Sequence, residues 1–355
     1  MTTRSGRAGR IALLAASALL AGVAVEVVLR LLGAGPVPVN PDQRSLWAYH
    51  PQLGWSSTAG YEDSFDTEFF SVDVAINSRG LRDDELSLEK PEDVRRVLVV
   101  GDSFAWGFGV EQEDTFAARL ERALPATEVI NGAVSGYSTD QALLWLRLEG
   151  RQYAPDVVVY ALSGNDDIMN HMQVAYWTYY KPSYRLDPQA GLLLQGVPVP
   201  ITSFGDRLRH ALRSRSAIAK ALEIALRGHE AAFVYLADSY PDPGDPHRLT
   251  VALVNGLRAE AHRAGASLVV VANSQFWFSP SGSYERLVDE LRGAGHDVVD
   301  VESRPGWDSA AMQIPGDGHW NARGHEFVTG LLAKRLGKKN GTALEEDVRD
   351  EAGTR

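Results

Sequence analysis

From Arg96 onward the chain alternates short, almost wholly apolar runs with amphipathic stretches. The apolar runs are Val97–Val100, Glu128–Asn131, Asp156–Leu162, Ser267–Ala272 and His296–Val301. They are rich in β-branched residues, as expected for strands that are buried on both faces of a sheet. The helical patterns cover residues 115–124, 139–149, 246–264, 284–294 and 321–336. This alternation predicts βαβ units and an α/β fold around a five-stranded parallel sheet.

The N-terminus is basic and then strongly apolar. The first ten residues hold three arginines and no acid, and the segment Ile11–Val25 is uncharged and rich in Ala and Leu. A membrane-spanning helix needs about 20 residues. The segment Ile11–Leu32 is long enough if Glu26 and Arg30, four positions apart, pair with each other or extend to the interface.

A cleaved signal peptide is the alternative interpretation of this segment, because Gly22 and Ala24 are small residues of the kind found at cleavage sites. The apolar pattern continues past them to Leu32, which favours an uncleaved anchor over residues 1–34. Basic residues remain on the cytoplasmic side of such helices. We therefore expect a single-pass cell-membrane protein whose main domain is extracytoplasmic, either periplasmic or extracellular.

The rest of the chain divides by composition. Residues 35–94 read as a Gly/Pro linker followed by a β-rich extension that is dense in aromatic residues. Residues 95–337 form the main domain, in which residues 170–245 break the alternation and are interpreted as an insertion or lid. Residues 338–355 are polar and charged, and we expect a disordered tail.

Charge and cysteine content exclude some classes of function. The 355 residues carry a formal net charge of −11 and include no cysteine. Disulfides, thiolate metal ligands and a thiol nucleophile are therefore excluded. An acidic chain without a basic stripe is not suited to nucleic acid, so no nucleic-acid partner is expected.

Four polar clusters follow predicted strands or precede the last helix, and functional groups of parallel sheets gather at the carboxyl ends of strands. The first cluster, Gly101-Asp102-Ser103-Phe104, directly follows a strand. A serine on such a turn projects its hydroxyl into the crevice, and its backbone N–H points the same way. The alternative role of Ser103 is an ordinary helix N-cap.

Two further clusters offer donors for a developing oxyanion. Gly136 lies in a Gly-rich loop after the second strand, and its N–H can approach a ligand closely. Asn165 follows the third strand and supplies a side-chain N–H. Taken singly, the first is also explained as a plain loop and the second as an Asx-turn.

The fourth cluster, residues 316–321, contains Asp317 and His319. A serine hydroxyl needs an adjacent imidazole as base, and a carboxylate must hold that imidazole in the right tautomer. Asp317 and His319 are the nearest such pair, and Asp308 is a more distant substitute for the acid. His325 is the other histidine in this region; it lies on the next helix, where it would pack or contact solvent rather than act as the base.

Together these clusters and their order resemble the SGNH/GDSL hydrolase superfamily. The resemblance extends from about Leu46 to Leu336 and includes the Asn77–Arg82 element, which precedes the first motif in many bacterial, membrane-anchored members. It implies a flavodoxin-like three-layer α/β/α sandwich.

The resemblance also implies the roles of the site residues. Ser103 would be the nucleophile and His319 the base. The N–H groups of Ser103 and Gly136 would form the oxyanion hole together with Asn165.

The acid departs from the pattern of the superfamily. Family hydrolases commonly place it three residues before the histidine, where this chain has Gly316, whereas Asp317 stands two before. The D-x-H-W motif is similar to one found in the alginate O-acetyltransferase branch of the superfamily, although in that branch the motif precedes the serine in the chain. The choice between hydrolase and transferase is therefore open.

Three functions remain as hypotheses. The first is a serine esterase that acts, through an acyl-serine, on O-acyl or O-acetyl groups of an envelope glycan or a small ester. The second is an O-acetyltransferase that passes the acyl group to a saccharide hydroxyl, and the third is a catalytically silent binding protein with the same fold. The aromatic residues between Tyr176 and Tyr184 would stack on sugar rings or simply pack.

No cofactor and no metal ion are expected. Asp166, Asp167 and His171 are close in sequence, but no second ligand cluster accompanies them.

Overall fold

The computed structural model describes residues 4–31, 45–164, 166–171, 179–201, 216, 218, 247–275 and 283–337. The chain separates into two compact units. One comprises residues Met1–Pro41 and Ile201–Asp238, and the other comprises Asp42–Pro200 and Ser239–Arg355.

The larger unit is built on a five-stranded parallel sheet. Its strands are β5 (Arg95–Gly101), β6 (Thr127–Asn131), β7 (Val157–Leu162), β10 (Ser267–Ala272) and β11 (Asp297–Asp300). They lie in the order β11-β10-β7-β5-β6. Counted along the chain this is 2-1-3-4-5, the flavodoxin-like order. The predicted α/β fold is confirmed, and each predicted strand overlaps an observed one.

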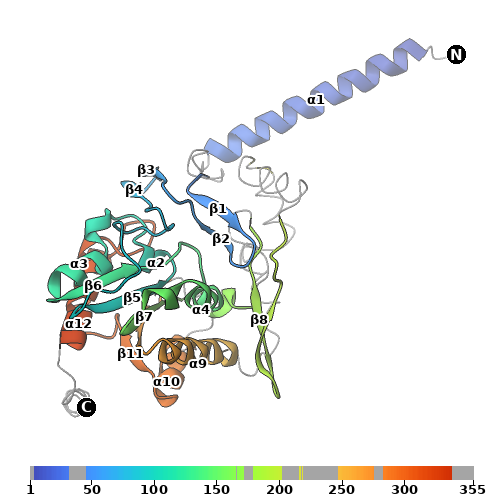
Figure 1. Ribbon diagram of the computed structural model, residues 1–355. Coiled ribbons are helices and arrows are strands. Elements are labelled where there is room, and N and C mark those ends of the chain that lie inside the picture. The colour runs from blue at the N-terminus through green and yellow to red at the C-terminus, as the bar shows by residue number, and fades with distance from the viewer. Residues whose placement is uncertain are drawn as a thin grey trace. The chain divides into compact units, whose positions relative to one another are not determined.

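Helices cover both faces of the sheet (Figure 1). On one face α3 (Phe116–Ala123) packs against α12 (Ala322–Gly337). On the other, α4 (Thr139–Leu148) packs against α9 (Arg248–Arg263), with α10 (Ser283–Gly293) beside it. The short helices are α2 (Ser103–Trp106), η2 (Gln112–Asp114), η3 (Gly150–Tyr153), α5 (Asp166–Met169) and α11 (Ser309–Met312).

Strand β5 shows why the sheet needs two cores. Leu98 and Val100 belong to the core on the α4 and α9 side, whereas Val97 and Val99 belong to the core on the α3 and α12 side. Successive side chains of a strand point to opposite faces, so an apolar run that is buried on both faces contributes to two cores.

The N-terminal extension forms two antiparallel hairpins. The first pairs β1 (Trp47–His50) with β2 (Gly54–Ser57), and the second pairs β3 (Glu62–Asp66) with β4 (Ser71–Ala75). Phe65 is 1% exposed and lies in the same core as strand β5. The second hairpin therefore packs as part of the main domain.

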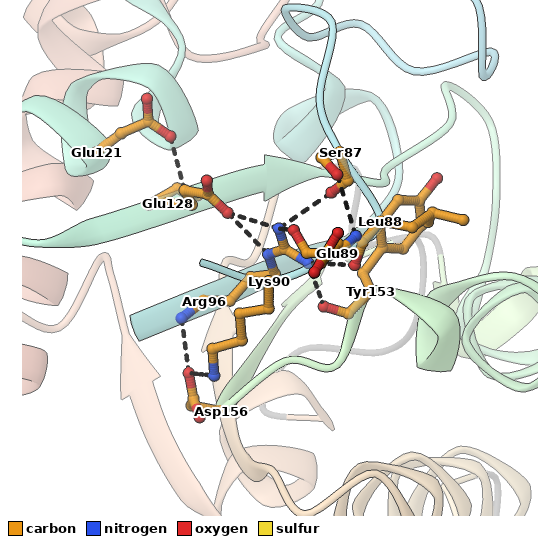
Figure 2. Close-up of polar contacts among 10 residues, drawn as sticks. Ser87, Leu88, Glu89, Lys90, Arg96, Glu121, Glu128, Tyr153 and Asp156 are labelled. Carbon is orange, nitrogen blue, oxygen red and sulfur yellow. Dashed lines mark hydrogen bonds and ion pairs between the residues drawn. The ribbon is translucent and has the colours of Figure 1, made fainter. Parts of the chain in front are cut away.

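A buried arginine joins the end of the extension to the sheet (Figure 2). The Arg96 side chain is fully buried, and its Nη1 donates to the carbonyl oxygens of Leu88 (3.0 Å) and Tyr153 (2.8 Å). Its Nη2 donates to the Ser87 carbonyl at 3.0 Å, and its Nε donates to the carboxylate of Glu128 at 2.8 Å. The boundary predicted between residues 94 and 95 thus separates segments that share buried hydrogen bonds.

The described part of the predicted insertion contains a third hairpin, β8 (Ser183–Asp187) with β9 (Gly191–Gln195), which packs against α4 and α9. Residues 35–44, at the start of the predicted linker and extension, and the predicted tail, residues 338–355, lie outside the described residues.

The smaller unit contains helix α1 (Arg4–Leu31). Its segment Leu13–Leu31 has 19 residues and a mean hydropathy of 2.0, and none of it is buried in the structure. Nε of Arg30 donates to the Glu26 carboxylate at 2.8 Å, as the spacing of these residues suggested. By length and composition this helix can cross a membrane, and a signal sequence meets the same criterion.

Candidate active site

Ser103 stands at the carboxyl end of strand β5, as the first residue of helix α2. Asp102 caps this helix, since its Oδ1 accepts the backbone N–H of Phe104 at 3.0 Å. Its Oδ2 accepts a second hydrogen bond, from the hydroxyl of Ser163, at 2.5 Å. Burial raises the pKa of the Asp102 carboxyl, and these hydrogen bonds and the His319 charge offset the effect only in part. The serine lies beside the switch point between β5 and β7, where open α/β sheets bind ligands.

The predicted base and acid lie beside this serine. Nε2 of His319 is 2.8 Å from Oγ of Ser103, and Nδ1 of His319 is 2.5 Å from Oδ1 of Asp317. The same carboxylate oxygen accepts the backbone N–H of His319 at 3.1 Å. Because the carboxylate can only accept, Nδ1 carries the ring proton and the Nε2 lone pair faces the serine hydroxyl.

Asp317 is ionised in this arrangement. Burial favours the neutral acid, but the hydrogen bond from the His319 ring, the charge of that ring and the His319 backbone N–H together hold the carboxyl pKa below its usual value. The acid two residues before the histidine can therefore orient the imidazole. The departure from the common spacing does not break the chain of contacts.

Of the three predicted oxyanion donors, Ser103 and Gly136 are described and Asn165 is not. Gly136 has φ +81°, a conformation that favours glycine. Its loop runs along the end of β5, where the N–H of Val134 donates to the carbonyl of Gly101 at 3.2 Å. Asn165 lies outside the described residues.

A buried network ties the Gly136 loop to the residues that follow strand β7. The hydroxyl of Tyr160 is 2.7 Å from the Asp166 carboxylate and 2.8 Å from Oγ1 of Thr139. Asn170 donates to the same Thr139 hydroxyl at 2.9 Å. The start of α4 and helix α5 are therefore fixed relative to each other.

The extension also supports the Gly136 loop, which the sequence did not predict. Nε1 of Trp55 donates to the carbonyl of Ser135 at 3.0 Å, and the hydroxyl of Tyr137 donates to the carbonyl of Trp55 at 2.6 Å. Gln141 donates to the carbonyl of Leu53 at 2.8 Å. The only available signal in the sequence was the density of aromatic residues between Trp47 and Leu81.

The alternative base and acid have structural roles. His325 is buried and its Nδ1 accepts the N–H of Phe116 at 3.1 Å. Burial is the main cause and nearby positive charges the lesser cause of a pKa that is lowered to about 3, so the ring is neutral. Asp308 is exposed and caps helix α11 by accepting the N–H of Ala310 at 3.1 Å.

Of the three residues considered as metal ligands, Asp167 contacts the start of helix α9. Asp167 is buried and contacts Nδ1 of His247 at 3.0 Å and the hydroxyl of Thr250 at 2.6 Å. Among the residues that the structure describes, no group of three His, Cys, Asp or Glu side chains is placed to hold a metal ion.

Three of the aromatic residues considered for sugar stacking, Tyr179, Tyr180 and Tyr184, are described, and two of these are engaged elsewhere. Tyr184 is 4% exposed and lies in the core. Tyr179 stacks on Trp55 at 6.2 Å between ring centroids and donates its hydroxyl to the carbonyl of Trp47. Both therefore have packing roles.

The fold and the site define a serine hydrolase of the α/β class. Residues 99–327 match the GDSL-like Lipase/Acylhydrolase family. This match covers more than half of the chain, so the protein belongs to that family and is a GDSL-type hydrolase, as the sequence predicted. A comparison with curated proteins found no significant match.

Several solved structures resemble the chain at low identity. A two-domain esterase active on acetylated mannans is 12% identical, with a TM-score of 0.39 and a match over 69% of this chain and 49% of that one. A lipase/acylhydrolase from Enterococcus faecalis is 16% identical, with a TM-score of 0.36; the match covers 68% of this chain and 95% of that one. A catalytic mutant of an acetylxylan esterase from Geobacillus stearothermophilus is 13% identical, with a TM-score of 0.38; the match covers 68% of this chain and 94% of that one.

Proposed function

We propose that the protein is a membrane-anchored serine esterase that hydrolyses O-acyl or O-acetyl esters of an envelope glycan or of a small molecule. The observation that supports this most directly is the continuous line of contacts from Oγ of Ser103 through the His319 ring to Asp317. A serine, an imidazole and an ionised carboxylate in this order activate a hydroxyl for acyl transfer.

In the first half of the reaction, Oγ of Ser103 bonds to the ester carbonyl carbon as Nε2 of His319 takes the hydroxyl proton. The carbonyl π electrons move to oxygen. When they return, the bond from carbon to the alcohol oxygen breaks, and the alcohol leaves with the proton from His319. An acyl-serine remains, and water repeats the sequence with His319 as base to release the acid.

The proposed oxyanion hole consists of the N–H groups of Ser103 and Gly136 and the side chain of Asn165. Gly136 has a backbone conformation and a loop position that suit this role. Loss of one such donor commonly costs about 10²- to 10³-fold in kcat. Asn165→Ala is expected to fall in that range while the variant stays folded.

The proposed organisation follows the sequence. Residues 1–34 anchor the chain, residues 35–94 form the linker and β-rich extension, and residues 95–337 form the hydrolase domain, with an insertion at 170–245 and a tail at 338–355. The apolar helix α1 and the basic residues before it support an anchor with an extracytoplasmic catalytic domain.

The D-G-H-W motif at residues 317–320 favours a second candidate, an O-acetyltransferase in which a saccharide hydroxyl replaces water as the acyl acceptor. The two candidates share the acyl-serine. They differ in whether acyl groups released from a donor ester appear as free acid or on added saccharide.

The test uses the full chain in detergent with a panel of acyl esters and acetylated polysaccharides, alongside Ser103→Ala. We expect wild-type turnover that Ser103→Ala abolishes, and labelling of wild type but not of Ser103→Ala by a fluorophosphonate. Turnover that survives Ser103→Ala would refute the assignment. Transfer to added saccharide in preference to water would establish the second candidate.

A further inference from the structure

The imidazole of His319 contacts two phenyl rings in addition to its polar partners. The ring centroid of Phe108 lies 4.5 Å from that of His319, and the centroid of Phe104 lies 4.9 Å away, each with an interplanar angle of 37°. Phe104 belongs to the nucleophile's own helix, α2. Phe108 lies in the loop after this helix, so the placement of its ring depends on what holds that loop.

A buried arginine of the extension holds this loop on both sides of Phe108. Nη1 of Arg82 donates to the carbonyl of Gly107 at 2.5 Å, and its Nη2 donates to the carbonyl of Val110 at 2.7 Å. The Arg82 guanidinium also lies 4.5 Å from the centroid of the Trp106 ring. Burial lowers the pKa of Arg82 to about 10, an effect that nearby glutamates oppose, so the side chain remains a cation at neutral pH.

The second hairpin of the extension supports the Phe108 ring itself. Phe70, in the turn between β3 and β4, lies 5.1 Å from Phe108 between centroids at an interplanar angle of 83°. Phe65 lies 5.3 Å from the same ring at 70°. Edge-to-face pairs of this kind contribute stability beyond the area that they bury.

The loop also fits closely against the loop that carries the histidine. Gly109 has φ +83°, and a Cβ atom there would lie 2.3 Å from Cδ1 of Ile314. The backbone N–H of Ile314 donates to the carbonyl of His319 at 2.8 Å. The loop with Phe108 and the loop with His319 therefore pack as one unit.

We propose that Phe108 is a positioning residue for the general base, and that the N-terminal extension holds it through Arg82 and Phe70. This inference rests on the proposed role of His319. The phenyl rings restrict rotation of the imidazole away from the line between Ser103 and Asp317, and aromatic rings also stabilise the imidazolium that forms as the proton transfers. Both effects act at the transition state, so they contribute to kcat and leave substrate binding unchanged.

The first experiment compares Phe108→Leu with Phe108→Tyr in the full chain. Since small displacements of a catalytic group cost up to about 10²-fold, we expect Phe108→Leu to lower kcat by about 10- to 100-fold with KM nearly unchanged. Phe108→Tyr keeps the ring and is expected to stay within about threefold of wild type. Phe327→Leu is the matched control, because Phe327 is half-buried and packs on Trp307 at 5.6 Å.

The second experiment tests whether the extension acts through Phe108. Phe70→Leu is expected to lower kcat in the wild-type background and to have little further effect in Phe108→Leu, because contacting residues are coupled in a double-mutant cycle. Phe70→Leu also supplies an independent variant if Phe108→Leu does not fold, and thermal midpoints are recorded for every variant.

The outcomes separate the two hypotheses. Turnover that survives Ser103→Ala would remove the proposed function and this inference with it. If Ser103→Ala is inactive but Phe108→Leu keeps its kcat, or raises KM alone, the positioning role is wrong and the proposed function stands. Fully additive losses in the Phe70 and Phe108 cycle would overturn the role of the extension.

Discussion

Nε2 of His319 lies 2.8 Å from Oγ of Ser103, although 216 positions separate the two residues in the chain. The sheet accounts for one side of this contact, because Ser103 closes strand β5. Helix α12 follows the His319 loop and packs against α3, which brings that loop back to the serine. The contact therefore depends on tertiary packing on one face of the sheet.

The orienting role of Asp317 is tested by Asp317→Asn. An amide carries no negative charge to stabilise the imidazolium, and where its NH2 group faces Nδ1 the ring proton moves to Nε2, which faces Ser103. We expect kcat to fall by about 10²- to 10⁴-fold with KM little changed. Steady-state kinetics on an acetyl ester and the rate of fluorophosphonate labelling measure this loss.

Asp308→Asn is the matched control for that variant. Asp308 is exposed, and Asn is an equally good helix N-cap, so both kcat and stability should remain at the wild-type level. A large loss in Asp308→Asn together with a small loss in Asp317→Asn would reverse the assignment of the acid.

Buried His325 makes stability depend on pH. Its pKa is about 3 in the folded protein, against about 6.5 in an unfolded chain, because burial disfavours the charged ring. Below about pH 6.5 the unfolded state binds a proton that the folded state does not, so stability falls as pH falls from that value towards 3. The linkage amounts to about 2 kcal/mol between pH 7 and pH 5.

His325→Asn removes this proton while keeping an acceptor for the N–H of Phe116. Urea denaturation at several pH values should show wild type losing about 2 kcal/mol more than the variant between pH 7 and pH 5. His262→Gln, on an exposed helix position, should retain the wild-type slope. Parallel curves for wild type and His325→Asn would show that the buried ring is protonated in the folded protein.

Arg96 is expected to be among the residues most important for stability. Arg96→Ala leaves the carbonyls of Leu88 and Tyr153 without their buried donor, so we expect a loss of about 3–5 kcal/mol in the free energy of unfolding. Arg335→Ala breaks the partly exposed pair with Asp297 and should cost under about 1 kcal/mol. Similar urea midpoints for the two variants would contradict this difference.

The sequence predicted the sheet because its strands are local, apolar and bounded by turns. Ser267–Ala272 was predicted to the residue. Ser103 was predicted as a site residue because functional groups gather at strand ends, and His319 because it lies beside an acid before the last helix; the structure places the two side chains 2.8 Å apart. Phe108 was missed, and Arg82 was named only as the end of the Asn77–Arg82 element, since the roles of both depend on contacts between segments that no periodicity connects. Arg96 was missed because an arginine at the start of a strand is ordinarily exposed.

Gly109 provides a direct test of the packing between the Phe108 loop and the His319 loop. Gly109→Ala adds a Cβ atom 2.3 Å from Cδ1 of Ile314, at a φ of +83°. Gly60→Ala meets a similar φ of +73° with nothing within 4 Å, so it carries the backbone strain without the clash. The strain alone costs about 1 kcal/mol of stability and should leave kcat unchanged. The Ile314 side chain must turn away or the two loops must separate, so we expect Gly109→Ala to lower kcat by up to about tenfold. Equal kcat in the two variants would mean that the base keeps its alignment without this contact.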